Sequence, residues 1–360
     1  MRTMIRSLIK RRVFCPAVRE ALEKAHHEVL GLSHTRSGEG LVQLDLTKRE
    51  DVERAFEDFR PNWVIHCAAE RRPDVAEKVR YLVSAAVHLP FGSPDSFKRD
   101  PEGTRILNAQ VPEHLASLSK KLKYTLVYIS TDYVFDGTSP PYTPSSTPNP
   151  LQLYGQSKRD GELAVLGVAG ASVIILRVPV LYGPAPRNSD SAINILLDVV
   201  QDQSGKTYKM DHYATRYPTN VLDIAQFLVR LSETGPALAR TPNHYLTSAT
   251  PPSFPSIFPQ SLTHAAALGY KKPIPPILHY SAAEPFTKYE ICLVYAKILG
   301  LPHGHIIPDA EPPSGPGATT RPRDCQLYTR ETEDLRVGEE GDASLGVSLF
   351  EEWWSAYLKK

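Results

Sequence analysis

The chain has 360 residues and a formal net charge of +1. A chain of this length can bury a large core in one or two domains, and its near-neutral charge gives no basic footprint of the kind that binds nucleic acid. It has no apolar run of about 18 residues, so no membrane-spanning helix is expected.

Four cysteines are scattered along the chain: Cys15, Cys67, Cys292 and Cys325. Their spacing matches no metal-binding pattern, so we predict no metal site. Scattered cysteines are typical of a reducing compartment, and we expect the protein to be cytoplasmic.

Residues 1–12 contain five basic residues and no acidic one. Two interpretations are open for this segment. It is either a mitochondrial presequence or a short basic start that carries no targeting signal, and we favour the second.

Residues 16–28 predict a helix, because small and apolar side chains recur on one side of it, and residues 29–32 predict a strand. In a dinucleotide-binding unit, such a helix follows a strand and a Gly-rich turn that approaches the pyrophosphate. Here the first glycine is Gly31, and residues 11–16 stand where the turn belongs. We therefore expect the first strand and the Gly-rich turn to be atypical or missing.

Two later stretches bear on a dinucleotide cofactor. Arg36 follows the second strand, where an NADP site places a basic residue for the 2′-phosphate; the alternative is a solvated loop arginine. Residues 63–69 predict a buried strand that runs into small residues. Ala68 and Ala69 there would let a cofactor pack against the backbone, and we interpret His66 as a core histidine.

The most informative stretch is residues 127–158. A buried strand ends in Ser130 and Thr131, and after a Pro-rich loop Tyr154 and Lys158 open a helix. Four helical residues make about one turn, so Tyr154 and Lys158 share a face. Ligands of open parallel sheets bind beyond the carboxyl ends of the strands, which is where Thr131 lies.

These three side chains have a common chemical use. A carbonyl that receives a hydride needs a proton and a donor for its developing oxyanion. A phenol has a pKa near ~10, and a nearby ammonium lowers it. Tyr154 would therefore supply the proton, Lys158 would lower the pKa of Tyr154, and Thr131 would hold the oxygen.

The remaining pattern alternates strands and helices. Residues 172–178 predict a fully buried strand, and helices are predicted at residues 191–200, 221–231, 286–299 and 344–358. Residues 246–276 are rich in proline and show no periodicity, so we interpret them as a disordered insertion.

Three motifs carry a resemblance to a known family. They are Ser-Thr-Asp-Tyr-Val-Phe-Asp-Gly at 130–137, Leu-Tyr-Gly-Gln-Ser-Lys at 153–158 and Leu-Arg-Val-Pro-Val-Leu-Tyr-Gly at 176–183. The chain resembles the extended short-chain dehydrogenase/reductases, within the dTDP-4-dehydrorhamnose reductase-like branch. The resemblance runs in pieces from about residue 13 to the C-terminus.

Three further segments, at residues 67–74, 210–212 and 216–219, resemble the family of regulatory beta subunits of methionine adenosyltransferase. In that family the reductase fold and the Tyr-Lys pair persist and NADP can bind. The resemblance implies a partner, the catalytic alpha subunit of methionine adenosyltransferase, whose S-adenosylmethionine synthesis the protein would tune.

The resemblance also implies roles for single residues. On the cofactor side, Asp45 would lie near an adenine, or else cap the helix predicted at 48–59. Asn108 would support the surroundings of the catalytic lysine, or else be a helix polar residue without chemistry. Pro179 would pack against a nicotinamide.

The substrate side of the family's cleft corresponds to two groups of residues here. Glu70, Arg71 and Arg72 border the active site or form a solvated loop. His212 and Arg216 contact a ligand anion or are satisfied surface groups.

The predicted fold class is α/β, a Rossmann-like doubly wound parallel sheet with a smaller C-terminal substrate-side subdomain. The predicted division is as follows: a nucleotide-binding part at 13–183 that returns at about 217–245, a substrate-side part at 184–216 and 277–335, insertions at 79–100 and 246–276, and a C-terminal helix at 336–360.

Three functions are compatible with this sequence: a regulatory subunit of methionine adenosyltransferase, an NADP-dependent reductase of a nucleotide-sugar 4-keto group, and a degenerate chain with neither role. We favour the first, because the motifs at residues 70–74 and 210–212 resemble the regulatory subunits. The missing phosphate-binding turn counts most against the second, since hydride transfer needs an accurately held cofactor. Fold analogy alone does not establish a function.

Overall fold

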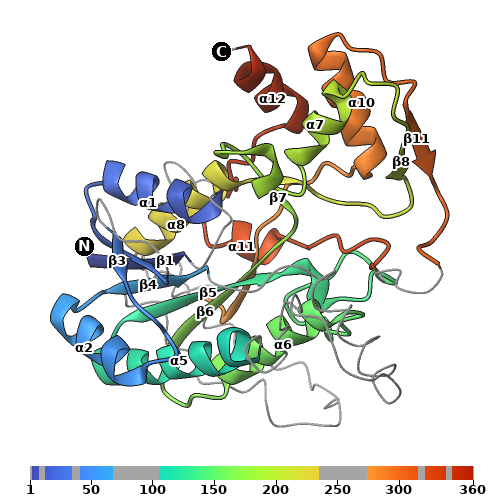
Figure 1. Cartoon of the computed structure of the whole chain (residues 1–360). Helices are drawn as coiled ribbons and strands as arrows, with labels where there is room; N and C mark the ends of the chain where they lie inside the picture. Colours follow the sequence, from blue (N-terminus) through green and yellow to red (C-terminus); the bar gives the residue numbers. More distant parts are fainter. Residues whose placement is uncertain are drawn as a thin grey trace, which may run out of the picture.

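Seven strands of the described chain form one parallel sheet in the order β10-β6-β5-β4-β1-β2-β3 (Figure 1). The computed structural model describes residues 2–7, 13–34, 41–67, 105–234, 274–314, 321–337 and 343–359. The strands are β1 (Arg2–Ser7), β2 (Glu28–Ser33), β3 (Leu41–Gln43), β4 (Trp63–His66), β5 (Thr125–Thr131), β6 (Ser172–Val178) and β10 (Ile277–His279). This is the strand order of a doubly wound Rossmann sheet, as predicted.

The first strand, expected to be atypical or missing, is present. β1 pairs in parallel with β2 on one side and β4 on the other, so that Ile5 lies opposite both Gly31 and Ile65. The winding of the sheet reverses between β1 and β4, which is where doubly wound sheets bind their ligands. The turn after β1, at residues 8–12, lies outside the described residues.

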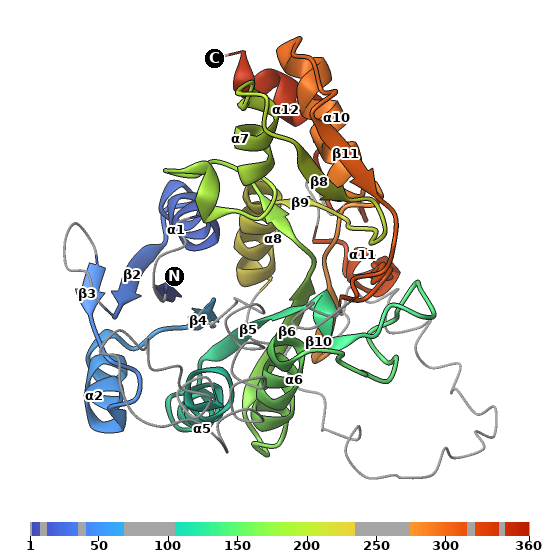
Figure 2. The ribbon, with the colours of Figure 1, turned by 45° about the vertical axis from the view of Figure 1, so that its right-hand side comes forward.

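Helices cover both faces of the sheet (Figure 2). α1 (Phe14–Lys24) and α8 (Val221–Glu233) pack on one face, and α2 (Arg49–Phe59), α5 (Val111–Leu122) and α6 (Leu153–Leu166) pack on the other. Successive strand side chains alternate between the two cores: Ile65 and Val127 join the first, Val64 and Leu126 the second. This two-sided burial explains why these strands read as continuous apolar runs.

A smaller part of the molecule lies beside the sheet, at the upper right of Figure 1. It contains α7 (Ile195–Gln201), α10 (Lys288–Leu299), α12 (Phe350–Leu358) and the parallel pair β8 (Tyr208–Asp211) and β11 (Ile306–Asp309). Its core is aromatic: Trp354 is fully buried against Tyr182, Tyr295 and Phe350. Two short strands, β7 (Leu181–Tyr182) and β9 (Thr219–Asn220), pair where this part meets the main sheet.

The boundaries of several elements differ from the prediction. Ile277–His279 is the edge strand of the main sheet beside β6, although we placed residues 277–335 on the substrate side. α7 and α12 begin later than predicted, and α12 packs into the core of the smaller part. Residues 79–100, predicted to be an insertion, lie outside the described residues, as do residues 246–273 of the insertion predicted at 246–276. Its last three residues are ordered, against the prediction: Ile274 is buried in the core, and the Pro276 carbonyl oxygen accepts from the Ile175 N–H at 2.8 Å.

A buried ion pair joins two strands and a helix at the centre of the fold. The Arg177 guanidinium on β6 donates two hydrogen bonds to the Glu162 carboxylate on α6, at 2.8 and 2.7 Å. Ser130, at the end of β5, donates to the same carboxylate at 2.6 Å. Burial raises the pKa of Glu162, but the Arg177 charge and these hydrogen bonds outweigh it, so the pKa of this carboxyl is lowered overall.

His279 on β10 extends this network. Its Nε2 lies 3.3 Å from Arg177 Nη1, and its Nδ1 lies 3.2 Å from the carbonyl oxygen of Tyr328. A neutral imidazole fits both partners, since Nε2 can accept from the guanidinium while Nδ1–H donates to the carbonyl. Burial and the Arg177 charge lower the pKa of His279 to about 3.

Close packing of α6 against the sheet depends on glycine. A Cβ added at Gly161 would clash with the Tyr128 hydroxyl and the carbonyl oxygen of Asn108. A Cβ at Gly155 would clash with the carbonyl oxygen of Tyr133. Both glycines therefore set how closely the helix that carries Tyr154 and Lys158 approaches β5.

We expect Gly161→Ala to lower the free energy of unfolding by roughly 1–3 kcal/mol, because α6 must move away from Tyr128. Urea unfolding would measure this change. Gly304→Ala is the matched control, since a Cβ there meets nothing within 4 Å. Equal stability of Gly161→Ala and the wild type would contradict the packing described here.

We also expect the protein to lose stability as the pH falls from 6.5 towards 3. The unfolded chain protonates His279 at its ordinary pKa of 6.5, whereas the folded chain does so only near a pKa of about 3. In that window the unfolded state binds more protons, so unfolding becomes easier as the pH falls. Urea unfolding at pH 7 and pH 5 should show a smaller pH dependence for His279→Gln than for the wild type. An identical pH dependence in the two proteins would show that His279 is not the group responsible.

Candidate functional site

The predicted proton-delivery residues lie where β5 ends and α6 begins. Thr131 is the last residue of β5, and Tyr154 and Lys158 lie one turn apart at the start of α6. Tyr133 joins the two elements, since its ring lies edge-on to the ring of Tyr154 with 6.3 Å between centroids. The close approach allowed by Gly155 fixes this contact.

The Thr131 hydroxyl is already engaged. It donates to Asp132 Oδ1 at 3.0 Å and accepts the backbone N–H of Tyr133 at 3.3 Å, which caps a short turn at Asp132–Val134. Burial raises the pKa of Asp132 to about 6, against the opposing charge of Arg216. To hold a substrate oxygen by donation, Thr131 would have to give up its hydrogen bond to Asp132.

Lys158 is buried and packs against a second tyrosine. Its ammonium lies 3.8 Å from the centroid of the Tyr128 ring on β5, in cation–π contact. Burial raises the pKa of Tyr128 well above 10, so this phenol stays protonated. The structure thus shows Lys158 against Tyr128, whereas its predicted action on the pKa of Tyr154 stays a prediction.

Asn108 lies beside this lysine. It belongs to a π-helical turn, Ile106–Gln110, that leads into α5, and its side chain donates to Ser157 Oγ at 2.9 Å. Its carbonyl oxygen accepts from the Tyr128 hydroxyl at 3.1 Å. Asn108 is therefore a buried contact between α6, β5 and the start of α5, and its partner Ser157 directly precedes Lys158 in the chain.

The candidate cofactor residues are only partly described. Asp45 follows β3 and accepts from the Thr47 backbone N–H and hydroxyl, at 3.0 and 2.9 Å. It forms a turn before α2, whose N-cap is Lys48, so the alternative of Asp45 as the helix cap is wrong. Pro179 is buried directly after β6. Arg36, Ala68 and Ala69 lie outside the described residues.

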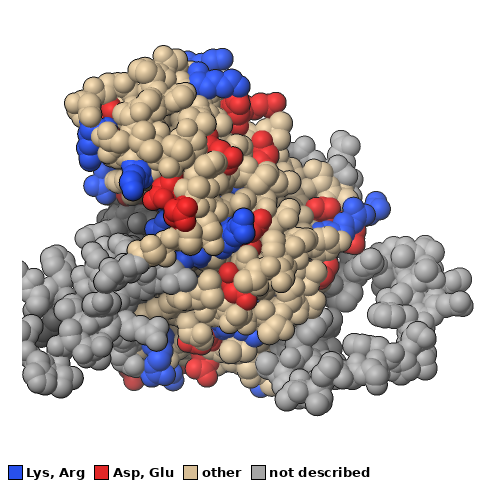
Figure 3. Space-filling view, turned by 90° about the vertical axis from the view of Figure 1, so that its right-hand side faces the viewer, with Lys and Arg blue, Asp and Glu red and all other residues tan. Residues whose placement is uncertain are grey.

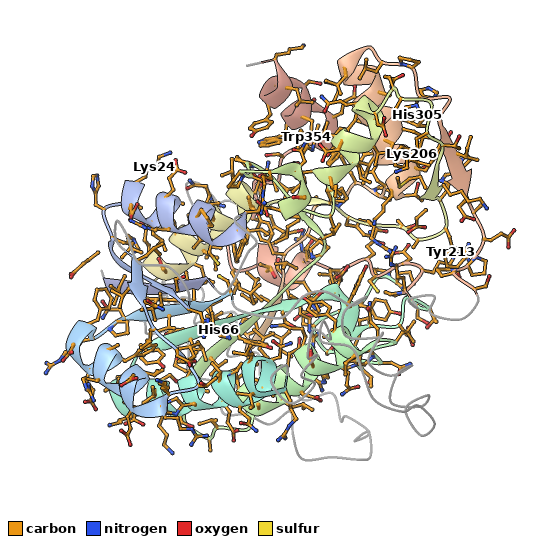
Figure 4. All side chains as sticks on the ribbon, in the orientation of Figure 1. Lys24, His66, Lys206, Tyr213, His305 and Trp354 are labelled. Carbon is orange, nitrogen blue, oxygen red and sulfur yellow. The ribbon has the colours of Figure 1, made fainter. Side chains whose placement is uncertain are left out.

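His66 is a core residue, as predicted. It is fully buried at the end of β4, and its ring stacks on Tyr128 with 5.9 Å between centroids (Figure 4).

The strand ends of the main sheet fit a dinucleotide, whereas the segment that would bind its phosphates does not. All strands of the main sheet are parallel, so Asp45, Thr131 and Pro179 follow strand ends at one edge, where such cofactors bind. The phosphate-binding half does not fit, because no glycine precedes Gly31 and the helix that would receive the pyrophosphate begins at Phe14. We therefore derive no chemical step through a dinucleotide.

On the substrate side, the backbone brings three segments together. Arg216 exchanges two backbone hydrogen bonds with Phe286, at 2.7 and 2.8 Å, and the Thr215 N–H donates to the Arg323 carbonyl at 2.8 Å. His212 Nδ1 lies 2.9 Å from the hydroxyl of Thr287, the N-cap of α10. Glu70, Arg71 and Arg72, predicted to lie here, are outside the described residues.

Three charged residues of this region were not predicted as site residues. The charges of Arg321 and Arg216 act on Lys288, and the charges of Asp132 and Arg216 act on each other. Thr287 and Glu290 form a capping box, a Thr-x-x-Glu signature that places Lys288 at the first position of α10. That signature was available in the sequence, whereas the approach of Arg321 arises from tertiary structure alone.

None of the helices in the described part of the chain combines the length and the apolar character that spanning a bilayer requires. Among the same residues, no group of three or more His, Cys, Asp or Glu side chains is placed to hold a metal ion.

Comparison with known proteins places the chain in a family. The model of the RmlD substrate binding domain matches residues 13–89 and 82–249. Methionine adenosyltransferase 2 subunit beta of Xenopus tropicalis is 35% identical over 343 residues, 95% of this chain and 84% of the relative. The mouse protein of the same name is 32% identical over 96% of this chain and 85% of its own. A dTDP-4-keto-6-deoxy-D-glucose reductase of Streptomyces niveus is 32% identical over 53% of this chain and 58% of its own.

Solved structures share the fold. A dTDP-4-dehydrorhamnose reductase of Bacillus anthracis in complex with NADP has a TM-score of 0.68 at 20% identity, over 100% of this chain and 99% of its own. The Bordetella bronchiseptica enzyme WbmG in complex with NAD and UDP has a TM-score of 0.63 at 18% identity, over 99% and 92%. The chain therefore belongs to the RmlD substrate binding domain family, among the relatives of methionine adenosyltransferase 2 subunit beta.

Proposed function

We propose that the protein is a regulatory, non-catalytic subunit that binds the catalytic alpha subunit of a methionine adenosyltransferase and tunes S-adenosylmethionine synthesis, in the cytoplasm. The observation that carries this proposal is the 35% identity to methionine adenosyltransferase 2 subunit beta along 95% of the chain. The likeness to a bacterial sugar reductase covers only 53% of the chain.

Two features of the candidate site support a non-catalytic role: the sequence of the phosphate-binding segment and the hydrogen bond of the Thr131 hydroxyl. Hydride transfer requires a nicotinamide held accurately against the substrate. The segment before Phe14 has no glycine through which the backbone could approach a pyrophosphate. The Thr131 hydroxyl donates to Asp132 and is not free to hold an oxyanion. A regulatory subunit needs neither a phosphate-binding glycine turn nor a free hydroxyl for an oxyanion.

A second function is an NADP-dependent reduction of a dTDP-4-keto-6-deoxy sugar. The specific observation in its favour is the retained set Thr131, Tyr154 and Lys158 at the carboxyl end of β5. In this proposal Tyr154 delivers the proton to the carbonyl oxygen and Thr131 orients it. Arg36, Asp45, Ala68, Ala69 and Pro179 would line the NADP, and Glu70, Arg71, Arg72, His212 and Arg216 would line the substrate.

The first test is assembly. The full chain, mixed with a methionine adenosyltransferase catalytic subunit, should co-elute with it in size-exclusion chromatography and change the kcat or KM of S-adenosylmethionine synthesis. Tyr154→Phe is the control and should act like the wild type, because a regulator needs no proton donor. Absence of both co-elution and kinetic change would refute the regulatory role.

The second test is NADPH binding, measured by titration calorimetry. We expect weak binding or none, because the phosphate-binding turn is not found in the sequence. Micromolar or tighter affinity would overturn this expectation. If NADPH is also oxidised in the presence of a dTDP-4-keto sugar, and Tyr154→Phe abolishes that turnover, the reductase function replaces the regulatory one.

A further inference from the structure

A short segment before α12 joins the two cores of the molecule. Residues 345–350, which we call the strap, lead into this helix. The Leu345 side chain is buried in the core between the sheet, α1 and α8, whereas Phe350 is buried in the aromatic core of the smaller part. Trp354, labelled in Figure 4, lies one turn further along α12 in the same aromatic core. The strap therefore connects the main part of the molecule to α12.

Donors from the main part hold the start of the strap. The Tyr280 hydroxyl donates to the carbonyl oxygen of Leu345 at 2.9 Å. The Arg230 guanidinium on α8 donates to the same oxygen at 3.4 Å and to the carbonyl oxygen of Val337 at 2.7 Å. These bonds fix the first residue of the strap against α8.

Two carboxylates hold the rest of the strap. Asp223, in the first turn of α8, accepts the Ser348 backbone N–H at 2.6 Å and the Ser348 hydroxyl at 2.9 Å. Glu284 accepts the backbone N–H of Phe350, the first residue of α12, at 2.6 Å. Asp223 thus receives both donors of one serine, and the second of these bonds lasts only while the hydroxyl keeps its proton.

The carboxylate of Asp223 is poorly solvated. Burial raises its pKa, while its hydrogen bonds from Ser348 and the charge of Arg230 act in the opposite direction. A second negative group at the Ser348 hydroxyl would meet this carboxylate with little water between them, where like charges repel strongly. The bond between Asp223 and Ser348 therefore requires a neutral side chain at residue 348.

Acidic residues directly follow this serine. Glu351 and Glu352 stand three and four positions after Ser348. Glu352 is exposed, and Glu351 is paired with Lys297 at 2.5 Å. A protein with a basic binding groove complements a serine that is followed by such carboxylates. Both residues line one hollow of the surface, together with Glu284, Leu349 and Lys359.

Recognition of Ser348 would depend on these neighbouring carboxylates. The described residues on the face shown in Figure 3 carry no broad field of one sign, since Lys and Arg side chains alternate there with Asp and Glu. A continuous patch of one sign would be needed to attract a basic partner over a distance. The acidic residues next to Ser348 in the chain would therefore supply the selectivity.

We propose that Ser348 is phosphorylated by a serine kinase of acidic specificity, and that the phosphate releases the strap from Asp223. The γ-phosphorus of ATP forms a bond to Ser348 Oγ as its bond to the β–γ bridging oxygen breaks. ADP keeps that electron pair, and the hydroxyl proton passes to the base of the kinase. The product carries a charge of about −1.5 to −2 at pH 7 and has lost the proton that bonded Asp223.

The phosphate and the Asp223 carboxylate oppose closure of the strap. In the closed strap the Ser348 hydroxyl is bonded to Asp223, so the kinase acts on molecules in which the strap is open. The phosphate then keeps the strap open, because Asp223 faces a dianion rather than a donor. Opening removes the hydrogen bonds that hold the start of α12, so this helix unfolds locally more often.

The first experiment asks whether Ser348 is a substrate. The full chain is incubated with ATP and casein kinase II, which selects acidic residues downstream of a serine, and each phosphorylated serine is followed in time by mass spectrometry. We expect Ser348 to be phosphorylated, and severalfold faster in Asp223→Asn, whose strap opens more easily. Glu351→Gln and Glu352→Gln should slow the reaction, because they remove acidic recognition residues. Glu331→Gln, which changes an exposed carboxylate elsewhere in the chain, is the matched control and should not.

The second experiment asks what the phosphate does. Phosphoserine is incorporated at position 348 by codon suppression, and hydrogen exchange of the α12 amides is measured by mass spectrometry. We expect exchange at least about tenfold faster than in the unmodified chain, since repulsion at Asp223 favours opening. Phosphoserine at Ser344 is the matched control. Ser344 is exposed, and its hydroxyl accepts the Gly346 backbone N–H rather than bonding to Asp223.

Substitutions separate the charge of the added group from its size. The side chains introduced by Ser348→Asp and Ser348→Asn are nearly equal in size, so a difference in exchange of the α12 amides reports the charge. We expect severalfold faster exchange in Ser348→Asp than in Ser348→Asn. This difference should largely disappear when each is combined with Asp223→Asn, because the opposing carboxylate is then gone.

Three outcomes would overturn the proposal. The first is that Ser348 stays unmodified in the wild type and in Asp223→Asn alike, and the second is that phosphate at Ser348 changes exchange no more than phosphate at Ser344. The third is slower exchange, which would mean that Arg230 captures the phosphate and tightens the strap. All measurements use the isolated chain, so their outcome is independent of the proposed regulatory role.

Discussion

The buried pair of Glu162 and Arg177 is the interaction on which the rest of the structure depends. It joins α6 to β6, takes in Ser130 from β5, and reaches β10 through His279. Both charges are fully buried, so removing one partner would leave the other uncompensated, which costs about 3–5 kcal/mol. Because Ser130 precedes Thr131 and Glu162 lies one turn after Lys158, the same pair fixes the two elements that carry the candidate site.

This dependence explains how the candidate proton-delivery residues can keep their positions in a protein proposed to be a regulator. Thr131, Tyr154 and Lys158 stand on elements that are bonded to one another through the core. Gly155 and Gly161 bring α6 against the sheet at the same place. The core therefore fixes the elements that carry these residues, and the position of the residues does not by itself imply turnover.

Two kinds of element could be predicted from the sequence: strands that are buried on both faces of the sheet, and helices that a motif such as Tyr154-x-x-x-Lys158 identifies. The strand at residues 172–178 has the predicted bounds, because its continuous run of apolar residues is typical of a strand that is buried on both faces. β1 was not predicted as a strand, since Arg2 and Arg6 interrupt its apolar character and its pairing with β2 and β4 defines it. The Arg216, Lys288 and Arg321 cluster could not be predicted from spacing, because more than 100 residues separate its first and last members.

Because β10 belongs to the main sheet, the molecule cannot be cut into two units at a single point in the chain. The chain leaves the main sheet after β6, builds part of the smaller unit, returns for α8 and β10, and leaves again for α10 and β11. Neither unit is a continuous stretch of polypeptide. A fragment that stops before residue 274 would lack the edge strand of the sheet and, from the smaller unit, α10 and Trp354 together. The two units should therefore melt as one cooperative transition rather than as separable folding domains.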